Sequence, residues 1–435
     1  MTRDDTPAER RVVMATDVPF WRGSTGAEQR MLALGQFLSQ PPFSLTIFFL
    51  GKVAPDDQAE IEHRGLDVVF FESERPPESF LKRIQWYIEA TRHQLENWIR
   101  GERQTSDAAS PQPLTLADYR WPWAVEHFRR LLQRVKPAAI ICQYVTMAYL
   151  LDALPAAERK QTLCVLDTHD ILHERGRQFS TAGFLHWLEI DEREEIDIWN
   201  RFDVVIAIQE QERQLIEMLT SKPTVIVAGH SLDHLPSVSA PVSSGDALVL
   251  GYIGSENYSN WHAINRFLIE VWPDLSMLSD PPVHLKIAGR ICDWFRMTRG
   301  AAGSQTGDRL MDRVELVGHV TELADFYNQV DMVVNPVQFG TGLKIKNVEA
   351  LAFGKPLVTT ASGAVGMPRK SLAAARVVEN MDEMRQALIE LCRQSAVRDE
   401  LQNAAKRLGK SLFSAESIFS ELREALLSLT QPVRH

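Results

Sequence analysis

The chain has 435 residues, 45% of them hydrophobic and 24% charged, which is the composition of an ordinary soluble globular protein. This length can hold two or three domains, each with its own core. The net charge of −10 argues against a broad nucleic-acid-binding surface, so nucleic acid is not expected as a partner.

Membrane-spanning and disulfide-rich classes are also disfavoured. No apolar run approaches the roughly 18–20 residues of a membrane span, and the start of the chain, MTRDDTPAERR, lacks the apolar core of a signal peptide. The four cysteines lie far apart without a C-x-x-C pair, at Cys142, Cys164, Cys292 and Cys392. This predicts reduced, buried thiols in a cytoplasmic protein, with peripheral contact at the inner face of a membrane left open.

The first elements predict a doubly wound domain. A strand is expected at Arg11–Ala15, followed by a loop that contains Gly23 and Gly26 and then by an amphipathic helix. Strand, glycine loop and helix form the opening of a mononucleotide-binding fold. Glu28 and Arg30, both on this helix, are expected to be solvated.

Six further strands are expected in the N-terminal half, at Leu45–Leu50, Leu66–Phe71, Ala138–Gln143, Leu163–Asp167, Val204–Ile208 and Val225–Ala228. They alternate with helical segments, which favours a parallel sheet with right-handed crossovers. The pattern is interrupted at about 78–136, where a long helix at Ser79–Arg103 and a loop at Gln104–Pro113 are expected. We interpret this excursion as helices packed on the sheet, the alternative being an acceptor- or membrane-facing patch.

Asp167-Thr168-His169-Asp170 stands where a strand ends and a helix begins, the edge at which α/β enzymes place their chemistry. Three interpretations stay open for His169: a histidine at a ligand site, a structural histidine, or a metal ligand together with Asp167, Asp170 and His173. The acidic run that follows, His186–Asn200, is expected to be a solvated helix face. Asp170 can serve as a helix N-cap.

The C-terminal half repeats the alternation after a Pro- and Ser-rich linker at about His234–Gly245. Its most informative stretch is Asn335–Thr360, where a buried strand runs into Gly340-Thr341-Gly342 and then into a helix. Such a loop at a helix N-terminus is an anion site, because free N–H groups and the helix dipole point at it. A capped core helix with a surface Lys346–Glu349 pair is the alternative. The tail is expected to form helices at Met381–Arg393, Val397–Leu412 and Ala415–Leu429.

Several of these segments resemble the GT4-type retaining glycosyltransferases (glycosyl transferases group 1). GTGLKIKNVEALAFGKPLVTT is similar to the donor-site signature of that family, and Gly251–Ser255, His284–Gly289 and Val314–Val320 resemble its neighbouring strands in order. The resemblance covers most of Leu248 to Gly366. It implies the α/β GT-B fold, in which two doubly wound Rossmann-like domains face each other across a cleft.

The resemblance also implies how the domains divide the work. Residues 1–236 would form the acceptor-side domain, 246–412 the nucleotide-sugar-binding domain, and 413–435 a helix that crosses back to the first domain. The donor, a UDP- or GDP-sugar, would bind without a metal or cofactor at Gly23, Gly26, Gly254, Ser255, Arg290, Gly318, Gly340, Thr341, Gly342, Lys344, Lys346 and Glu349. His169 and Lys344 would be catalytic. In the family, the second glutamate of the signature accepts the ribose hydroxyls, which is the role expected for Glu349.

Two positions depart from the signature of the family. Thr341 stands where relatives carry the first of two glutamates separated by seven residues, and Asn257, Asn260 and Trp261 follow Gly254 where many relatives carry an arginine and a lysine. We therefore expect the phosphate charge to rest on Lys344, with Arg290 as a helper.

The sequence thus predicts a retaining glycosyltransferase that transfers a sugar to a glycan or lipid-linked acceptor. Three alternatives remain at this point: a sugar-nucleotide epimerase with the same fold, a metallohydrolase built on Asp167–His173, and an inactive GT-B scaffold.

Overall fold

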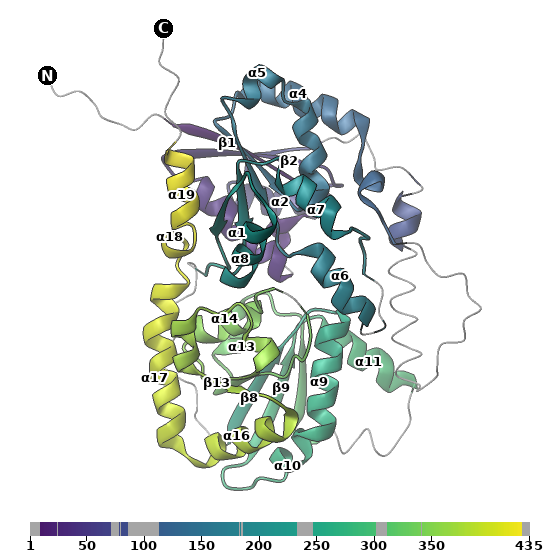
Figure 1. Ribbon diagram of the computed structural model, residues 1–435. Coiled ribbons are helices and arrows are strands. Elements are labelled where there is room, and N and C mark those ends of the chain that lie inside the picture. Colours follow the sequence, from purple (N-terminus) through teal and green to yellow (C-terminus); the bar gives the residue numbers. More distant parts are fainter. Residues whose placement is uncertain are drawn as a thin grey trace, which may run out of the picture. The chain divides into compact units, whose positions relative to one another are not determined.

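The computed structural model describes residues 9–23, 25–70, 78, 80–85, 113–181, 183, 186–232, 247–301, 311–340 and 342–428, apart from the side chains of 297–301 and 410. Most of the predicted Ser79–Arg103 helix, the loop after it, the 234–245 linker and Thr341 lie outside these residues. The chain forms two compact units, one of Met1–Gly229 with Phe419–His435 and one of His230–Ile418 (Figure 1).

The first unit contains a seven-stranded parallel sheet in the order β3-β2-β1-β4-β5-β6-β7. The strands are β1 (Arg10–Thr16), β2 (Phe43–Phe49), β3 (Val68–Val69), β4 (Ala139–Gln143), β5 (Leu163–Asp167), β6 (Val204–Ala207) and β7 (Thr224–Val227). The helices are η1 (Phe20–Arg22), α1 (Gly26–Leu38), α2 (Pro55–His63), η2 (Leu116–Tyr119), α4 (Pro122–Val135), η3 (Val145–Ala153), α5 (Ala156–Arg159), α6 (Leu172–Thr181), α7 (Glu192–Trp199), α8 (Glu210–Leu219) and α19 (Ser420–Leu427).

The second unit contains a six-stranded parallel sheet in the order β10-β9-β8-β11-β12-β13. The strands are β8 (Leu248–Ile253), β9 (Val283–Ala288), β10 (Val314–Gly318), β11 (Met332–Asn335), β12 (Leu357–Thr360) and β13 (Ala375–Val378). The helices are α9 (Tyr258–Glu270), α10 (Trp272–Ser276), α11 (Ile291–Ala301), α13 (Leu323–Tyr327), α14 (Ile345–Ala352), α15 (Ala361–Ala364), η4 (Arg369–Ala374), α16 (Met381–Arg393), α17 (Ser395–Leu412) and α18 (Ala415–Ile418).

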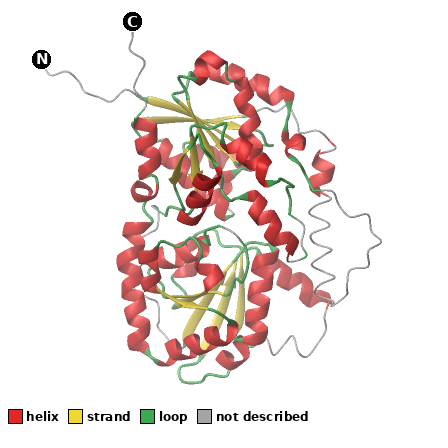
Figure 2. Cartoon of the chain, viewed as in Figure 1, coloured by secondary structure: helices red, strands yellow, loops and turns green. Residues whose placement is uncertain are grey.

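Both sheets confirm the prediction of parallel, doubly wound architecture (Figure 2). Their central strands are buried because helices pack on the sheets, so they read as continuous apolar runs in the sequence. In each sheet the strand order reverses at one point, between β1 and β4 in the first unit and between β8 and β11 in the second. Ligands of such folds bind outside the carboxyl ends of the strands at this switch point.

Three elements differ from the prediction. β13 was not expected, and the strand predicted at Leu66–Phe71 is two residues long among the described residues, where β3 is the edge strand beside β2. The single helix expected at Ala415–Leu429 is broken into α18 and α19, with Phe419 between them packing on Phe37 at 5.1 Å between ring centroids. α19 belongs to the first unit, where the carbonyl of Leu426 accepts a hydrogen bond from Arg10.

Among the described residues, none of the helices has the length and apolar character needed to cross a membrane.

Candidate active site

The carboxyl edge of the second sheet carries the predicted anion loop. β11 ends at Asn335 and α14 begins at Ile345, with Lys344 at its N-cap. Gly340 (φ 113°) and Gly342 (φ 78°) adopt left-handed conformations that a side chain would oppose. Lys344 Nζ donates to the carbonyls of both glycines, at 2.9 and 2.8 Å, so its ammonium group closes the loop on itself.

Lys346, two residues further and the second residue of α14, has other partners. Its Nζ donates to Asn260 Oδ1 at 2.6 Å and to the hydroxyl of Tyr252 at 3.2 Å, and lies 4.4 Å from the centroid of the Tyr252 ring. Burial lowers the pKa of this lysine to about 7. A cation from α14 is thereby held against the first turn of α9, where the resemblance led us to expect basic residues from α9 itself.

Glu349 is buried, with 4% of its surface exposed, and its carboxylate accepts a hydrogen bond from the hydroxyl of Tyr327 at 2.8 Å. Burial raises its pKa to about 7. Tyr327 is itself fixed by stacking on Phe353, with 4.6 Å between ring centroids. The alternative of a surface Lys346–Glu349 pair is therefore wrong, because both side chains have other partners and the carboxylate is enclosed.

A buried polar layer lies beneath this loop, and the sequence analysis did not predict it. Asn335 Nδ2 donates to Asn347 Oδ1 at 2.9 Å, and Asn347 Nδ2 donates to the carbonyl of Gly363 at 2.8 Å. Both asparagines are fully buried. Buried amides need such partners, and the chain of bonds joins β11, α14 and α15 into one rigid support. The sequence feature that could have indicated this layer is the presence of two asparagines within otherwise apolar strand and helix segments.

Three glycine loops stack at the other half of the same edge. Gly254 donates its N–H to the carbonyl of Ala288 at 3.0 Å, and Gly289 donates its N–H to the carbonyl of Gly318 at 2.7 Å. Gly289 has φ 89°, and a Cβ there would lie 2.3 Å from the Gly254 oxygen, so only glycine fits. Gly318 also has a positive φ, of 89°. The N–H of Gly254 is thus used within the sheet edge.

Ser255 and Arg290 have partners within this unit. Ser255 Oγ accepts from the side-chain amides of Asn257 at 3.0 Å and Asn260 at 3.2 Å. Arg290 forms an ion pair with Glu256, and its side chain is 47% exposed. Among the predicted cations, Lys346 contacts Asn260, whereas Arg290 is paired with the carboxylate of Glu256.

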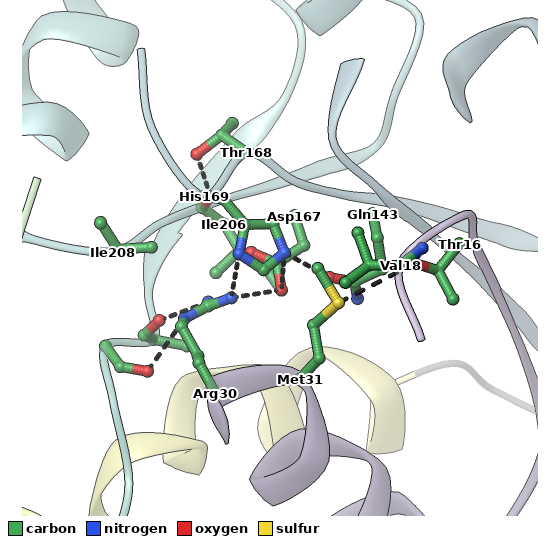
Figure 3. Close-up of polar contacts among 12 residues, drawn as sticks. Thr16, Val18, Arg30, Met31, Gln143, Asp167, Thr168, His169, Ile206 and Ile208 are labelled. Atoms are coloured by element: carbon green, nitrogen blue, oxygen red, sulfur yellow. Dashed lines mark hydrogen bonds and ion pairs between the residues drawn. The ribbon is translucent and has the colours of Figure 1, made fainter. Parts of the chain in front are cut away.

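The first unit carries a second polar centre at the carboxyl end of β5 (Figure 3). Arg30, on α1, donates to Asp167 Oδ2 at 2.7 Å and to the carbonyls of Ala228 and Gly229 at 2.7 and 3.1 Å. The prediction that Arg30 is solvated was wrong, since only 3% of its surface is exposed. A helix position is solvated only if no other element covers it, and here the ends of β5 and β7 cover it.

His169 lies at the centre of this network. Its Nε2 is 2.5 Å from Gln143 Oε1, and its Nδ1 is 3.4 Å from Arg30 Nη1. Burial lowers the pKa of His169 to about 4, so the imidazole is neutral near pH 7. The residue is left-handed (φ 60°) and its ring stacks on Tyr144, which is left-handed too (φ 64°), with 4.2 Å between centroids. Non-glycine residues in this conformation cluster at functional sites.

The metal interpretation of Asp167–His173 finds no support in the part of the chain that is described, where no three His, Cys, Asp or Glu side chains are placed to hold an ion. His173 Nδ1 instead lies 2.7 Å from Glu195 Oε2. The same carboxylate accepts the N–H groups of Leu172 and His173, at 3.0 and 2.8 Å, and so caps α6. Asp170 pairs with Arg175. The other acidic residues of α7 are exposed, as predicted for this run, but Glu195 is fully buried.

Gly23 and Gly26 also belong to the first unit. Gly23 (φ 61°) ends η1, and Gly26 is the first residue of α1, which Thr25 caps by accepting the N–H of Glu28 at 3.3 Å. The remaining predicted donor-binding residues are in the second unit. Thr341 lies outside the described residues.

Residues 247–394 match the family model described as Glycosyl transferases group 1. The second unit contains a group 1 glycosyltransferase domain. No curated protein sequence matches the chain significantly. The solved structures with similar folds include Anabaena Alr3699/HepE in complex with UDP and glucose (TM-score 0.66, 13% identity, 97% of this chain and 100% of that one).

Sucrose-phosphate synthase from Thermosynechococcus elongatus is similar to the same degree (TM-score 0.66, 15% identity, 97% and 100% coverage). A Listeria monocytogenes protein assigned as a UDP-N-acetylglucosamine 2-epimerase also matches (TM-score 0.56, 12% identity, 98% and 98%). Because these structures are similar over almost the whole chain, the chain has the GT-B fold, as predicted. At such low identities the likeness establishes the fold alone.

Proposed function

We propose that this protein is a retaining glycosyltransferase that takes its sugar from a nucleoside-diphosphate donor, a UDP- or GDP-sugar. The observation that carries the proposal is the start of α14 in the group 1 glycosyltransferase domain, where glycine loop, lysines and a buried carboxylate converge at the switch point of the sheet. The similar HepE structures contain UDP, which favours a uridine nucleotide.

The parts have distinct roles in this proposal. The N-terminus of α14 and the ammonium groups of Lys344 and Lys346 would stabilise the charge that develops on the departing diphosphate. Glu349 would accept the two ribose hydroxyls, because a carboxylate has more lone pairs than the one that the Tyr327 hydroxyl uses. Lys346, and not Arg290, would serve as the second phosphate cation, because Arg290 is paired with Glu256.

Retention of the anomeric configuration by double displacement needs a carboxylate nucleophile close to the sugar. The carboxylates that act on the charge of His169 are Asp167, bound by Arg30, and Asp170, bound by Arg175. We therefore propose same-face attack, in which the acceptor hydroxyl loses its proton to the leaving phosphate. The acceptor, a glycan or lipid-linked hydroxyl, would bind to the first unit.

The first test is thermal unfolding in the presence of UDP-, GDP-, dTDP- and ADP-sugars, because a ligand that binds only the folded state raises the melting temperature. We expect a rise with one nucleotide, which is lost in Glu349→Ala. Glu390→Ala, on the exposed side of α16, is the matched control and should respond like the wild type. If no donor raises the melting temperature, the proposal is overturned.

Product analysis separates a transferase from its alternative. A transferase releases nucleoside diphosphate only when an acceptor is present, and NMR of the product reports whether the anomeric configuration is retained. An epimerase converts the sugar nucleotide without an acceptor, and that result would replace the proposed function.

A further inference from the structure

Arg30 stands out among the charged groups that the proposed function does not use. It is a buried cation with four acceptors around it, the carboxylate of Asp167, the carbonyls of Ala228 and Gly229, and Nδ1 of His169. A buried charge is costly unless it is paired and hydrogen-bonded, and an arrangement this complete fixes the side chain in one place.

The donor properties of Arg30 decide the tautomer of His169. A guanidinium group has only donors, so the ring nitrogen that faces it, Nδ1, must be the acceptor. The proton of the neutral imidazole is then on Nε2, where it donates to Gln143 Oε1 at 2.5 Å. Both ring nitrogens are thereby occupied inside the first unit, and the stacked ring of Tyr144 covers one face of the imidazole.

The same arrangement decides the charge of the ring. Asp167 Oδ2 lies 3.8 Å from His169 Nε2 and by itself would draw a second proton onto the imidazole. Arg30 neutralises that carboxylate at 2.7 Å. Asp170, the other carboxylate next in sequence to His169, is neutralised by Arg175 at 2.5 Å. Both carboxylates that act on the charge of the imidazole are thus held in ion pairs.

From this geometry we propose that Arg30, with Asp167 and Gln143, is a positioning residue that keeps His169 neutral and fixes its proton on Nε2. The inference rests on the proposed function for its consequence. A glycosyl transition state carries positive charge on the sugar, which an adjacent imidazolium would oppose and a neutral imidazole does not. Arg30 would thus act through His169 and touch no substrate.

The direct test is ¹⁵N NMR of histidine-labelled protein, with His169 assigned by the loss of its signals in His169→Gln. In the wild type we expect a neutral ring with the proton on Nε2 throughout the range from about pH 5.5 to about pH 8. A proton on Nδ1, or titration of the ring within this range, overturns the proposal without any variant at Arg30.

Variants extend the test to turnover. In Arg30→Met the carboxylate of Asp167 is left without its cation, so His169 should titrate near neutral pH. The kcat should fall about 100-fold and become dependent on pH, while donor affinity changes little. Arg30→Lys restores the charge and should restore a neutral ring and a flat pH profile. Arg159→Met removes another arginine–aspartate pair of the same unit, with Asp203, and is the matched control that should leave His169 unchanged.

Gln143→Leu serves if Arg30→Met does not fold, because it removes the acceptor of the Nε2 proton without leaving a charge. Arg30 still faces Nδ1 in this variant, so we expect a neutral ring with its proton on Nε2, and a proton on Nδ1 would overturn the proposal. The NMR result needs no donor. A wild type that binds no sugar nucleotide therefore refutes the proposed function, while the spectra still decide the role of Arg30.

Discussion

Replacing Glu349 by glutamine should stabilise the protein and weaken donor binding at the same time. Burial raises the pKa of this carboxyl from its ordinary 4.5 to about 7. At about 1.4 kcal/mol per tenfold change in proton affinity, this difference corresponds to about 3 kcal/mol of unfolding free energy. The buried carboxylate is thus a cost that the unliganded protein carries above neutral pH.

The sign follows from which state binds the proton more tightly. The folded state has the higher pKa, so the stabilising contribution of the protonated carboxyl is complete below pH 4.5 and is lost as the pH rises through about 7. Glutamine keeps an oxygen that can accept the hydrogen bond of Tyr327 and does not titrate. The advantage of Glu349→Gln over the wild type should therefore grow with pH.

Urea unfolding at about pH 5 and about pH 8 measures this directly, and we expect the difference between the two proteins to grow by about 2–3 kcal/mol over the interval. Lys346 titrates in the same interval, because burial lowers its pKa to about 7. Loss of the neighbouring Glu349 charge lowers that pKa further, so stability rises more with pH in the variant and Lys346 adds to the expected difference. Glu390→Gln, on α16, is the surface control, and its difference from the wild type should stay constant.

The same variant should bind donor about 10- to 100-fold more weakly, because hydrogen bonds to a charged acceptor contribute about 1.5–3 kcal/mol. Isothermal titration with the donor identified by thermal unfolding gives the dissociation constant. Parallel stability curves at the two pH values would refute the burial argument. An unchanged dissociation constant would refute the assignment of Glu349 to the ribose.

Two further predictions follow from backbone and capping geometry. Gly289→Ala should destabilise the second unit by about 2–4 kcal/mol, since a left-handed alanine is strained and its Cβ would lie 2.3 Å from the Gly254 oxygen. Urea unfolding measures this loss of stability. A loss under about 1 kcal/mol would contradict the prediction. Glu195→Ala should destabilise the first unit by about 2–4 kcal/mol. Leu172 and His173 lose the acceptor of their N–H groups, and the buried pair between Glu195 and the His173 ring is broken. In the same urea unfolding experiment, Glu194→Ala on the exposed side of α7 should cost far less.

The sequence by itself determined the parallel α/β architecture. Central strands such as β5 and β11 are buried on both faces, so each reads as a short apolar run, and the glycines at 340, 342 and 354 mark the ends of the neighbouring helices and loops. The position of Glu349, one turn after Lys346 at a helix start, was also visible, because helical periodicity is local. Local patterns of this kind need no knowledge of distant residues.

The partners of charged side chains were decided only by the tertiary structure. Arg30 and Glu195 lie on helices whose local sequence looks solvated, yet both are buried. The ends of strands more than a hundred positions away in the sequence cover Arg30, and a second helix covers Glu195. Lys346 meets Asn260 across 86 positions of the chain. Burial and ion pairing depend on which segments pack together, and no local periodicity encodes that choice, whereas hydrophobic periodicity encodes the elements that do the packing.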